Sequence, residues 1–280
     1  MYTKIIGITG SSGFIGSNLK KTLSKDFKVI DINLREYKEI DSLVEVLNDL
    51  KITHFLNCIG GKSVGMSKLD PFGDFISNVT CPTFILYALG MCKNKIHFTN
   101  ISSAGIYGEQ NPDYIKDFTF SPYAIHKKIF DDLLKLTISE NVEYLVVRPF
   151  SVYGPGLKKQ LLWDAYKKFT TINNSPVFYG TGNEVRNFIY IDDLCLIVKE
   201  HISQGVKGII DVGSNKSLTI REVLDTFVSL LGKDINYNFN NIIDKGNPRD
   251  LSKTQNKLKV PFNNYTSFHE GLKKYINWIK

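Results

Sequence analysis

Residues 5–16 decide the fold, and they read IIGITGSSGFIG. A mostly apolar pentapeptide leads directly into three glycines, Gly10, Gly13 and Gly16, and an amphipathic run then continues to about Ser24. This order predicts a buried strand, a tight turn and a helix. Glycines in such a turn let a pyrophosphate approach the backbone, and the N–H groups that open the helix then face its phosphates. The segment therefore predicts a dinucleotide-binding loop.

Strand and helix patterns alternate along the first 150 residues, which predicts a parallel, doubly wound α/β sheet of the Rossmann type. Beyond residue 150 the rhythm loosens into short strands, loops and helices. We therefore expect residues 1–150 to form the dinucleotide-binding domain, with its sheet completed by segments near 186–212. Residues 151–280 are expected to form mainly a smaller C-terminal α/β lobe. Residues 72–91 are predicted to be mostly helical, with a kink or a break at Pro82.

The composition is that of an ordinary globular protein, with 280 residues, 42% hydrophobic, 22% charged and a net charge of +7. No run of eighteen apolar residues suggests a membrane span, and the first strand follows the N-terminus too closely for a signal peptide. The lysines are scattered, which argues against nucleic acid and favours a phosphorylated cofactor and a diphosphate substrate. The cysteines form no Cys-x-x-Cys pair, so we expect reduced thiols in the cytoplasm and no metal site, at Cys58, Cys81, Cys92 and Cys195.

A second group of residues predicts proton transfer. Tyr123 and Lys127 are four positions apart, so they share one face of a helix. An ammonium near a phenol stabilises the phenolate and lowers the pKa of the tyrosine. Ser103 follows a predicted strand and can hydrogen-bond a substrate oxygen. Together with the glycine loop, these three residues predict an oxidoreductase that acts on an alcohol or a ketone.

The choice of cofactor depends on the end of the second strand. Asp31 has about the spacing from Gly10 that an acid bonding the ribose 2′-hydroxyl of NAD would have. However, a strand beginning near Lys28 would place Asp31 in mid-strand and Asn33 at its tip. Arg35 could then pair with a 2′-phosphate. The sequence therefore favours NADP slightly, with NAD as the alternative.

With these segments identified, the chain resembles the extended short-chain dehydrogenase/reductases of the NAD-dependent epimerase/dehydratase type. The resemblance extends over nearly the whole chain. It is specific for the family but not for the substrate. The matching segments, in chain order, are TGSSGFIG at 9–16, NCIG at 57–60, NV at 78–79, SSAGIYG at 102–108, YAIHK at 123–127, RPFSVYGPG at 148–156, RNFIYIDDL at 186–194 and RD at 249–250.

The resemblance implies a Rossmann domain, a C-terminal lobe that binds a nucleotide-diphosphate sugar, and homodimers built through helices near residues 74–92 and 121–139. It implies that Ser103, Tyr123 and Lys127 are the catalytic residues. The residues implied to contact substrate are Ser151, which stands where many relatives have Asn, and Arg186 and Arg249, which are expected at the diphosphate. The implied cofactor contacts are Gly10, Ser12, Gly13, Phe14, Ile15, Gly16, Asn33, Arg35, Cys58, Ile59, Gly60 and Lys127.

The pair Ala104-Gly105 narrows the reaction. Dehydratases of this family carry Asp-Glu at these positions, so the acid and base that eliminate water are missing here. The sequence favours an NADPH-dependent 4-keto-sugar reductase of deoxysugar or surface-polysaccharide biosynthesis, because Arg35 follows the second strand. The alternative is a nucleotide-sugar 4-epimerase with tightly bound NAD. A non-catalytic NADP-sensing protein is disfavoured because Tyr123 and Lys127 are both present.

Overall fold

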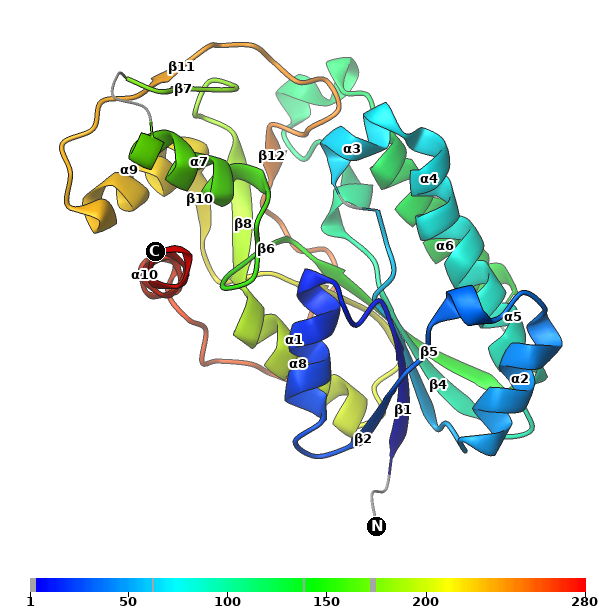
Figure 1. The fold of residues 1–280 in the computed structure, drawn as a ribbon. Helices are drawn as coiled ribbons and strands as arrows, with labels where there is room; N and C mark the ends of the chain where they lie inside the picture. The colour runs from blue at the N-terminus through cyan, green and yellow to red at the C-terminus, as the bar shows by residue number, and fades with distance from the viewer. Residues whose placement is uncertain (1–3, 62, 138, 172–174) are drawn as a thin grey trace.

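The computed structural model describes residues 4–61, 63–137, 139–171 and 175–280. It is an α/β structure with a parallel central sheet and a smaller lobe packed against one end of it (Figure 1). The fold class expected from the sequence is confirmed. Among the described residues, no helix has the length and apolarity needed to cross a bilayer.

The central sheet has six parallel strands in the order β2-β1-β3-β4-β5-β9. The chain leaves β1 toward β2 on one side and returns to β3 on the other, so the connections diverge at the carboxyl end of β1. In open parallel sheets this divergence creates the crevice in which ligands bind. The strands are β1 (Ile5–Thr9), β2 (Lys28–Asp31), β3 (His54–Asn57), β4 (Ile96–Ile101), β5 (Val142–Pro149) and β9 (Gly208–Val212).

Helices cover both faces of this sheet (Figure 1). One face packs on α1 (Phe14–Leu23) and α8 (Ile191–Ser203), and the other on α2 (Ile40–Asp49), α5 (Cys81–Met91) and α6 (Pro122–Thr137). Because successive strand residues point to opposite faces, neighbours on β5 enter different cores. Leu145 and Val147 belong to the α1/α8 cluster, and Val146 belongs to the other.

The segment predicted over 72–91 is helical throughout but irregular just before Pro82. The structure has α4 (Pro71–Phe75), a π-helical turn (Ile76–Thr80) and then α5. Pro82 has no N–H to bond the carbonyl four residues earlier, and the wider π turn lies where that bond would form. A short helix that the sequence reading did not predict, α3 (Val64–Leu69), precedes α4.

The smaller lobe is organised around β8 (Val185–Tyr190), which lies outside the central sheet. Residues 186–212 were expected to complete the central sheet, and β9 does join this sheet whereas β8 does not. The apolar cluster beneath α1 and α8 continues into the lobe through Phe188, Phe227 and Tyr275, and the domain boundary at residue 150 stays a prediction. The remaining elements are β6 (Ser151–Tyr153), α7 (Gln160–Thr171), β7 (Val177–Phe178), β10 (Ser217–Thr219), α9 (Ile220–Leu231), β11 (Asn238–Phe239), β12 (Asp250–Leu251) and α10 (Phe268–Ile279), with short 3₁₀ turns at Leu34–Glu36, Ala104–Tyr107 and Pro112–Asp117.

Candidate active site

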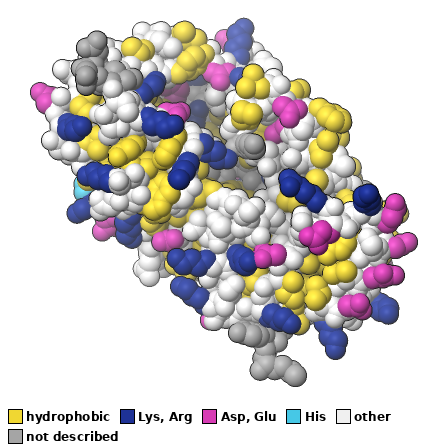
Figure 2. All heavy atoms as spheres, in the orientation of Figure 1, with side chains coloured by type: hydrophobic (Ala, Val, Ile, Leu, Met, Phe, Trp, Pro, Cys, Tyr) yellow, Lys and Arg dark blue, Asp and Glu magenta, His cyan; other side chains and the backbone are white. Residues whose placement is uncertain are grey.

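A cavity of about 830 Å³ lies at the carboxyl ends of the central strands and extends beneath the smaller lobe. Figure 2 shows the hollow between the two halves of the molecule. The glycine loop, the ends of β3 and β4 and the start of α6 line it from one side. The start of α7, β8 and the loop before β12 line it from the other. The cavity therefore joins the dinucleotide-binding end of the sheet to the second lobe.

The glycine loop at one end of the cavity can be built only with glycine. Gly10 has φ +69°, and a Cβ there would lie 2.6 Å from the Cys58 carbonyl carbon. A Cβ on Gly16 would lie 2.2 Å from the Gly10 carbonyl oxygen. α1 then begins at Phe14 with no side-chain cap and no acidic residue in its first turn. The uncapped N–H groups of a ten-residue helix fit the pyrophosphate of a dinucleotide.

Asp31 is the last residue of β2, and the structure corrects the expectation that it lies in mid-strand. Its carboxylate pairs with Lys20 of α1 and lies within hydrogen-bonding reach of the Ser11 hydroxyl in the glycine loop. The hydrogen bond from Lys20 holds the pKa of Asp31 below its usual range, so the group is ionised near neutral pH. This is the place from which an acid bonds the ribose 2′-hydroxyl of NAD.

The expected cofactor residues fall into two groups. Asn33 caps the 3₁₀ turn after β2 by accepting a hydrogen bond from the Arg35 amide (3.3 Å), and both side chains are exposed outside the cavity lining. Gly10 and Ser12 also lie outside that lining. The residues that do line the cavity are Gly13, Phe14, Ile15, Gly16, Cys58, Ile59, Gly60 and Lys127.

Two asparagines shape the segment after β3, and the sequence reading gave neither a role. Asn57 Oδ1 accepts hydrogen bonds from Thr9 Oγ1 (2.8 Å) and from the Ile59 amide (3.1 Å), which fixes the strand end beside the glycine loop. Asn78 Oδ1 accepts the Gly61 amide (3.0 Å). An asparagine at the end of an apolar strand, as at Asn57, is the sequence signal that could have indicated such a role, because a buried amide needs hydrogen-bond partners.

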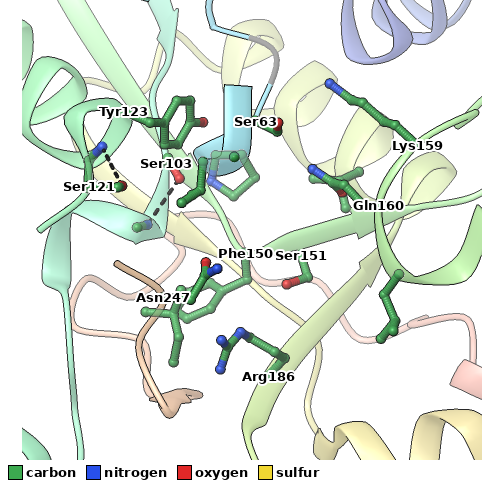
Figure 3. Close-up of a pocket in the computed structure, with 18 of the residues that line it drawn as sticks. Ser63, Ser103, Ser121, Tyr123, Phe150, Ser151, Lys159, Gln160, Arg186 and Asn247 are labelled. Carbon is green, nitrogen blue, oxygen red and sulfur yellow. Dashed lines mark hydrogen bonds between the residues drawn. The ribbon is translucent and has the colours of Figure 1, made fainter. Parts of the chain in front are cut away.

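The three expected catalytic residues all line the cavity, and Figure 3 shows Ser103 and Tyr123 side by side in it. Ser103 follows β4, and its Oγ accepts a hydrogen bond from the Gly105 amide (3.0 Å). Tyr123 lies in the first turn of α6. Lys127 follows one turn later and is 6% exposed, and its Nζ donates to the Ile101 carbonyl (2.8 Å). The structure therefore brings a hydroxyl, a phenol and an ammonium together.

Burial determines the protonation of this group. It raises the pKa of Tyr123, while the Ser103 hydroxyl acts in the opposite direction. It lowers the pKa of Lys127 to about 8, although Asp131 and Asp74 favour the ammonium. The ligand-free protein therefore does not have the lowered tyrosine pKa that we expected from Lys127. The partner that lowers it is Ser103.

A buried polar network lies behind Lys127, and the sequence reading missed it. Asp131, one turn further along α6, accepts a hydrogen bond from Arg148 Nε (2.9 Å). Arg148 Nη1 also donates to the Tyr107 hydroxyl (3.0 Å), which in turn donates to Asp211 (2.7 Å). These partners lie far apart in the sequence, so no local pattern could predict the network.

The expected substrate residues Ser151, Arg186 and Arg249 also line the cavity. The Arg186 guanidinium donates to the carbonyls of Val185 (2.8 Å) and Arg249 (3.3 Å), and burial lowers its pKa. The Arg249 guanidinium lies 3.8 Å from the centre of the Tyr114 ring. Two guanidinium groups in one wall fit a diphosphate.

Other polar side chains face the cavity without having been expected. Figure 3 shows Ser63, Ser121, Lys159, Gln160 and Asn247 around it. They come from α3, the start of α6, the start of α7 and the loop before β12. In the described part of the chain, no cluster of three or more His, Cys, Asp and Glu side chains could hold a metal ion.

Comparisons with known proteins agree with this geometry. The sequence model of the NAD dependent epimerase/dehydratase family matches residues 6–213. A UDP-glucuronate 4-epimerase of Thermodesulfobacterium geofontis is 27% identical over 274 residues, which cover 94% of this chain and 82% of that protein. A UDP-N-acetylglucosamine 4-epimerase of Methanobrevibacter ruminantium, solved with UDP-N-acetylmuramic acid, superposes with a TM-score of 0.81 at 22% identity, covering 100% of this chain and 99% of the other. A UDP-glucuronic acid 4-epimerase of Bacillus cereus, solved with UDP-glucuronic acid and NAD, gives 0.82 at 21% identity and 98% of both chains.

Proposed function

The chain belongs to the NAD dependent epimerase/dehydratase family, and on that premise we propose that it is a nucleotide-sugar 4-epimerase that uses NAD. This proposal replaces the NADPH-dependent 4-keto-sugar reductase that the sequence favoured. The named relatives are UDP-sugar 4-epimerases. The observation that carries the proposal is the group Ser103, Tyr123 and Lys127 at the junction of a pyrophosphate-binding helix and an arginine-lined second lobe.

The preference for NAD rests on Asp31. A carboxylate that ends β2 can accept two hydrogen bonds from a ribose, and its charge repels a 2′-phosphate. The residue that suggested NADP, Arg35, is exposed and outside the cavity lining. When bound, NAD would accept a hydride from C4 of the sugar and return it.

In this proposal the chain's own residues manage the proton. Tyr123 takes the proton of the sugar 4-hydroxyl and later gives it back. Ser103 hydrogen-bonds the same oxygen and holds it against the phenol. Lys127 contributes its charge and orients the bound cofactor. Arg186 and Arg249 hold the diphosphate, so that the sugar can turn inside the cavity between the two hydride transfers.

The substrate that we propose is a UDP-linked sugar, as for the named relatives. The test incubates purified protein with UDP-glucose, UDP-N-acetylglucosamine and UDP-glucuronate, and measures the 4-epimer by NMR. We expect one of these to be epimerised without consumption of added NADPH, and Tyr123→Phe to lower kcat by about 10³-fold. Oxidation of one NADPH per 4-keto-sugar nucleotide reduced would instead show that the protein is a reductase.

We also propose a homodimer. Large apolar side chains are exposed on α4, α5 and α6, the helices that the resemblance assigns to a four-helix interface. Size-exclusion chromatography with light scattering should give twice the chain mass for the native protein and the single mass for Tyr87→Asp combined with Leu136→Asp. The exposed residues are Phe72, Tyr87, Met91, Ile125 and Leu136.

A further inference from the structure

The first turn of α6, which carries Tyr123, is capped partly by another helix. A helix N-terminus leaves its first N–H groups without intrahelical partners. Here the first residue is a proline with no N–H. Ser121 serves the amides of the third and fourth helical residues, with its Oγ accepting from Ala124 (3.3 Å) and its carbonyl accepting from Ile125 (3.1 Å). The amide of Tyr123 itself donates to Ser67 Oγ of α3 (3.1 Å).

Ser67 is held rigidly for this contact. The side chain is 1% exposed, and its hydroxyl donates to the Val64 carbonyl (2.8 Å). With its proton used there, a lone pair remains to accept the Tyr123 amide. The contact therefore fixes the backbone of the residue whose phenol faces the cavity.

The helix α3 is also tied to the loop between β11 and β12. Lys68, the next residue, pairs with Asp244 (2.5 Å) in the loop of residues 240–249 between β11 and β12. Figure 1 shows this loop arching toward α3. A second tie runs from the Thr119 amide to the Lys245 carbonyl (3.2 Å), just before α6. The loop thus contacts both α3 and the approach to the catalytic helix.

The same loop and α3 share one cavity. Val64 and Gly65 line it from α3, and Ile243 and Asn247 line it from the loop of residues 240–249. A ligand that contacts both walls would hold the loop against α3 and keep the pair between Lys68 and Asp244 closed. Ser67 lies between that pair and Tyr123, so α3 is placed to transmit the change.

We propose that Ser67 is a positioning residue for Tyr123, and that α3 couples closure of the loop of residues 240–249 on a nucleotide sugar to the catalytic tyrosine. The identity of the ligand rests on the proposed function, whereas the contact between Ser67 and Tyr123 does not. The coupling makes full activity depend on an occupied second lobe.

The first experiment compares Ser67→Ala with Ser77→Ala. Ser77 is a serine of the neighbouring π turn whose hydroxyl donates locally, to the Gly73 carbonyl one turn earlier in α4 (2.9 Å). We expect Ser67→Ala to lower kcat about tenfold with KM changed less than about twofold, and Ser77→Ala to change neither. Because a displaced phenol loses the pKa-lowering contact with Ser103, the acid limb of the kcat profile should move to higher pH in Ser67→Ala alone. Equal KM and kcat effects with an unmoved limb would indicate a merely structural role and overturn the proposal.

The second experiment breaks the outer tie in two independent ways. Lys68→Met removes the charge, while Gly246→Ala places a Cβ 2.7 Å from Lys68 Nζ and displaces the ammonium without removing it. Lys68→Met and Gly246→Ala should each lower kcat about threefold, whereas Lys68→Arg, which keeps the charge, should have the wild-type kcat. In the Ser67→Ala background, Lys68→Met and Gly246→Ala should lower kcat no further. Lys95→Met, which breaks an exposed pair with Glu143, is the control. Additive losses in the double variants would refute transmission through Ser67.

A third measurement needs no substrate. Amide hydrogen exchange of Tyr123 in the ligand-free protein should be about tenfold faster in Ser67→Ala than in Ser77→Ala. If the wild type epimerised no sugar nucleotide, the proposed function would fail, and this exchange rate would still decide the contact. An unchanged rate would overturn the role of Ser67 even in an active epimerase.

Discussion

Replacement of Asp131 by Asn tests the network behind Lys127. Asp131 and Arg148 are 1% and 6% exposed, so their ion pair is buried. Removing one member of such a pair leaves the other charge without compensation and costs about 3–5 kcal/mol. Arg148 keeps its bond to the Tyr107 hydroxyl, so we expect the lower end, about 3 kcal/mol. A native domain of ordinary stability, about 5–15 kcal/mol, would remain folded.

The assay is urea denaturation of Asp131→Asn beside Lys128→Ala. Lys128 lies on the same helix and pairs with Asp132, but both side chains are exposed, so its loss should cost less than about 1 kcal/mol. Asp131→Asn should also change catalysis, because Asp131 is the largest influence that raises the pKa of Lys127 against burial. Without it that pKa falls further below its present value of about 8, and the alkaline limb of kcat moves to lower pH. A destabilisation equal to that of Lys128→Ala, or an unmoved alkaline limb, would refute this reasoning.

Three further changes have definite outcomes. His54 and His97 stack with ring centres 5.2 Å apart, and burial lowers the pKa of both, that of His54 to about 3. As the pH falls below about 6.5, the unfolded chain therefore binds protons that the folded protein does not, and urea denaturation should show the free energy of unfolding falling by about 1 kcal/mol per pH unit between pH 6.5 and 5. This loss should be smaller in His54→Gln than in a variant of the exposed His269. Gly16→Ala sets a Cβ against the Gly10 carbonyl, so we expect the purified variant to lose its bound NAD and to have a Tm lower by several degrees. The NAD content is measured by absorbance of the supernatant after the protein is denatured, and the Tm by calorimetry. Asp31→Asn removes the charge that opposes a 2′-phosphate, so calorimetric titration of cofactor-free protein should show NAD binding about tenfold weaker and NADP binding stronger; unchanged affinities would remove Asp31 from the cofactor site.

The local part of this structure could be predicted from the sequence. In the glycine loop, Gly13 and Gly16 both pack against the Gly10 carbonyl of the same strand–turn–helix unit, so the spacing of the glycines carries the information. Ser103, Tyr123 and Lys127 were found in the same way, because one strand end and one helical turn place them.

The errors arose where a position depends on long-range contacts. Strand pairing ends β2 at Asp31, whereas the sequence reading placed this residue in mid-strand. Ser67 meets Tyr123 across 56 positions and Arg148 meets Tyr107 across 41, so neither partner is marked by sequence spacing. The strand pairing of the smaller lobe was harder to predict. There β8 pairs with β6, which precedes it in the chain, and with β10 and β12, which follow it, and it does not extend the central sheet.

In the proposed reaction, a hydride leaves C4 of a UDP-sugar and returns to the same carbon. The direct test is turnover of the active UDP-sugar carrying deuterium at C4, in ordinary water with no added cofactor, followed by mass spectrometry and NMR of both epimers. We expect the 4-epimer to form with its deuterium retained at C4. Loss of the label from the product, or a strict requirement for NADPH with one equivalent oxidised per turnover, would contradict it.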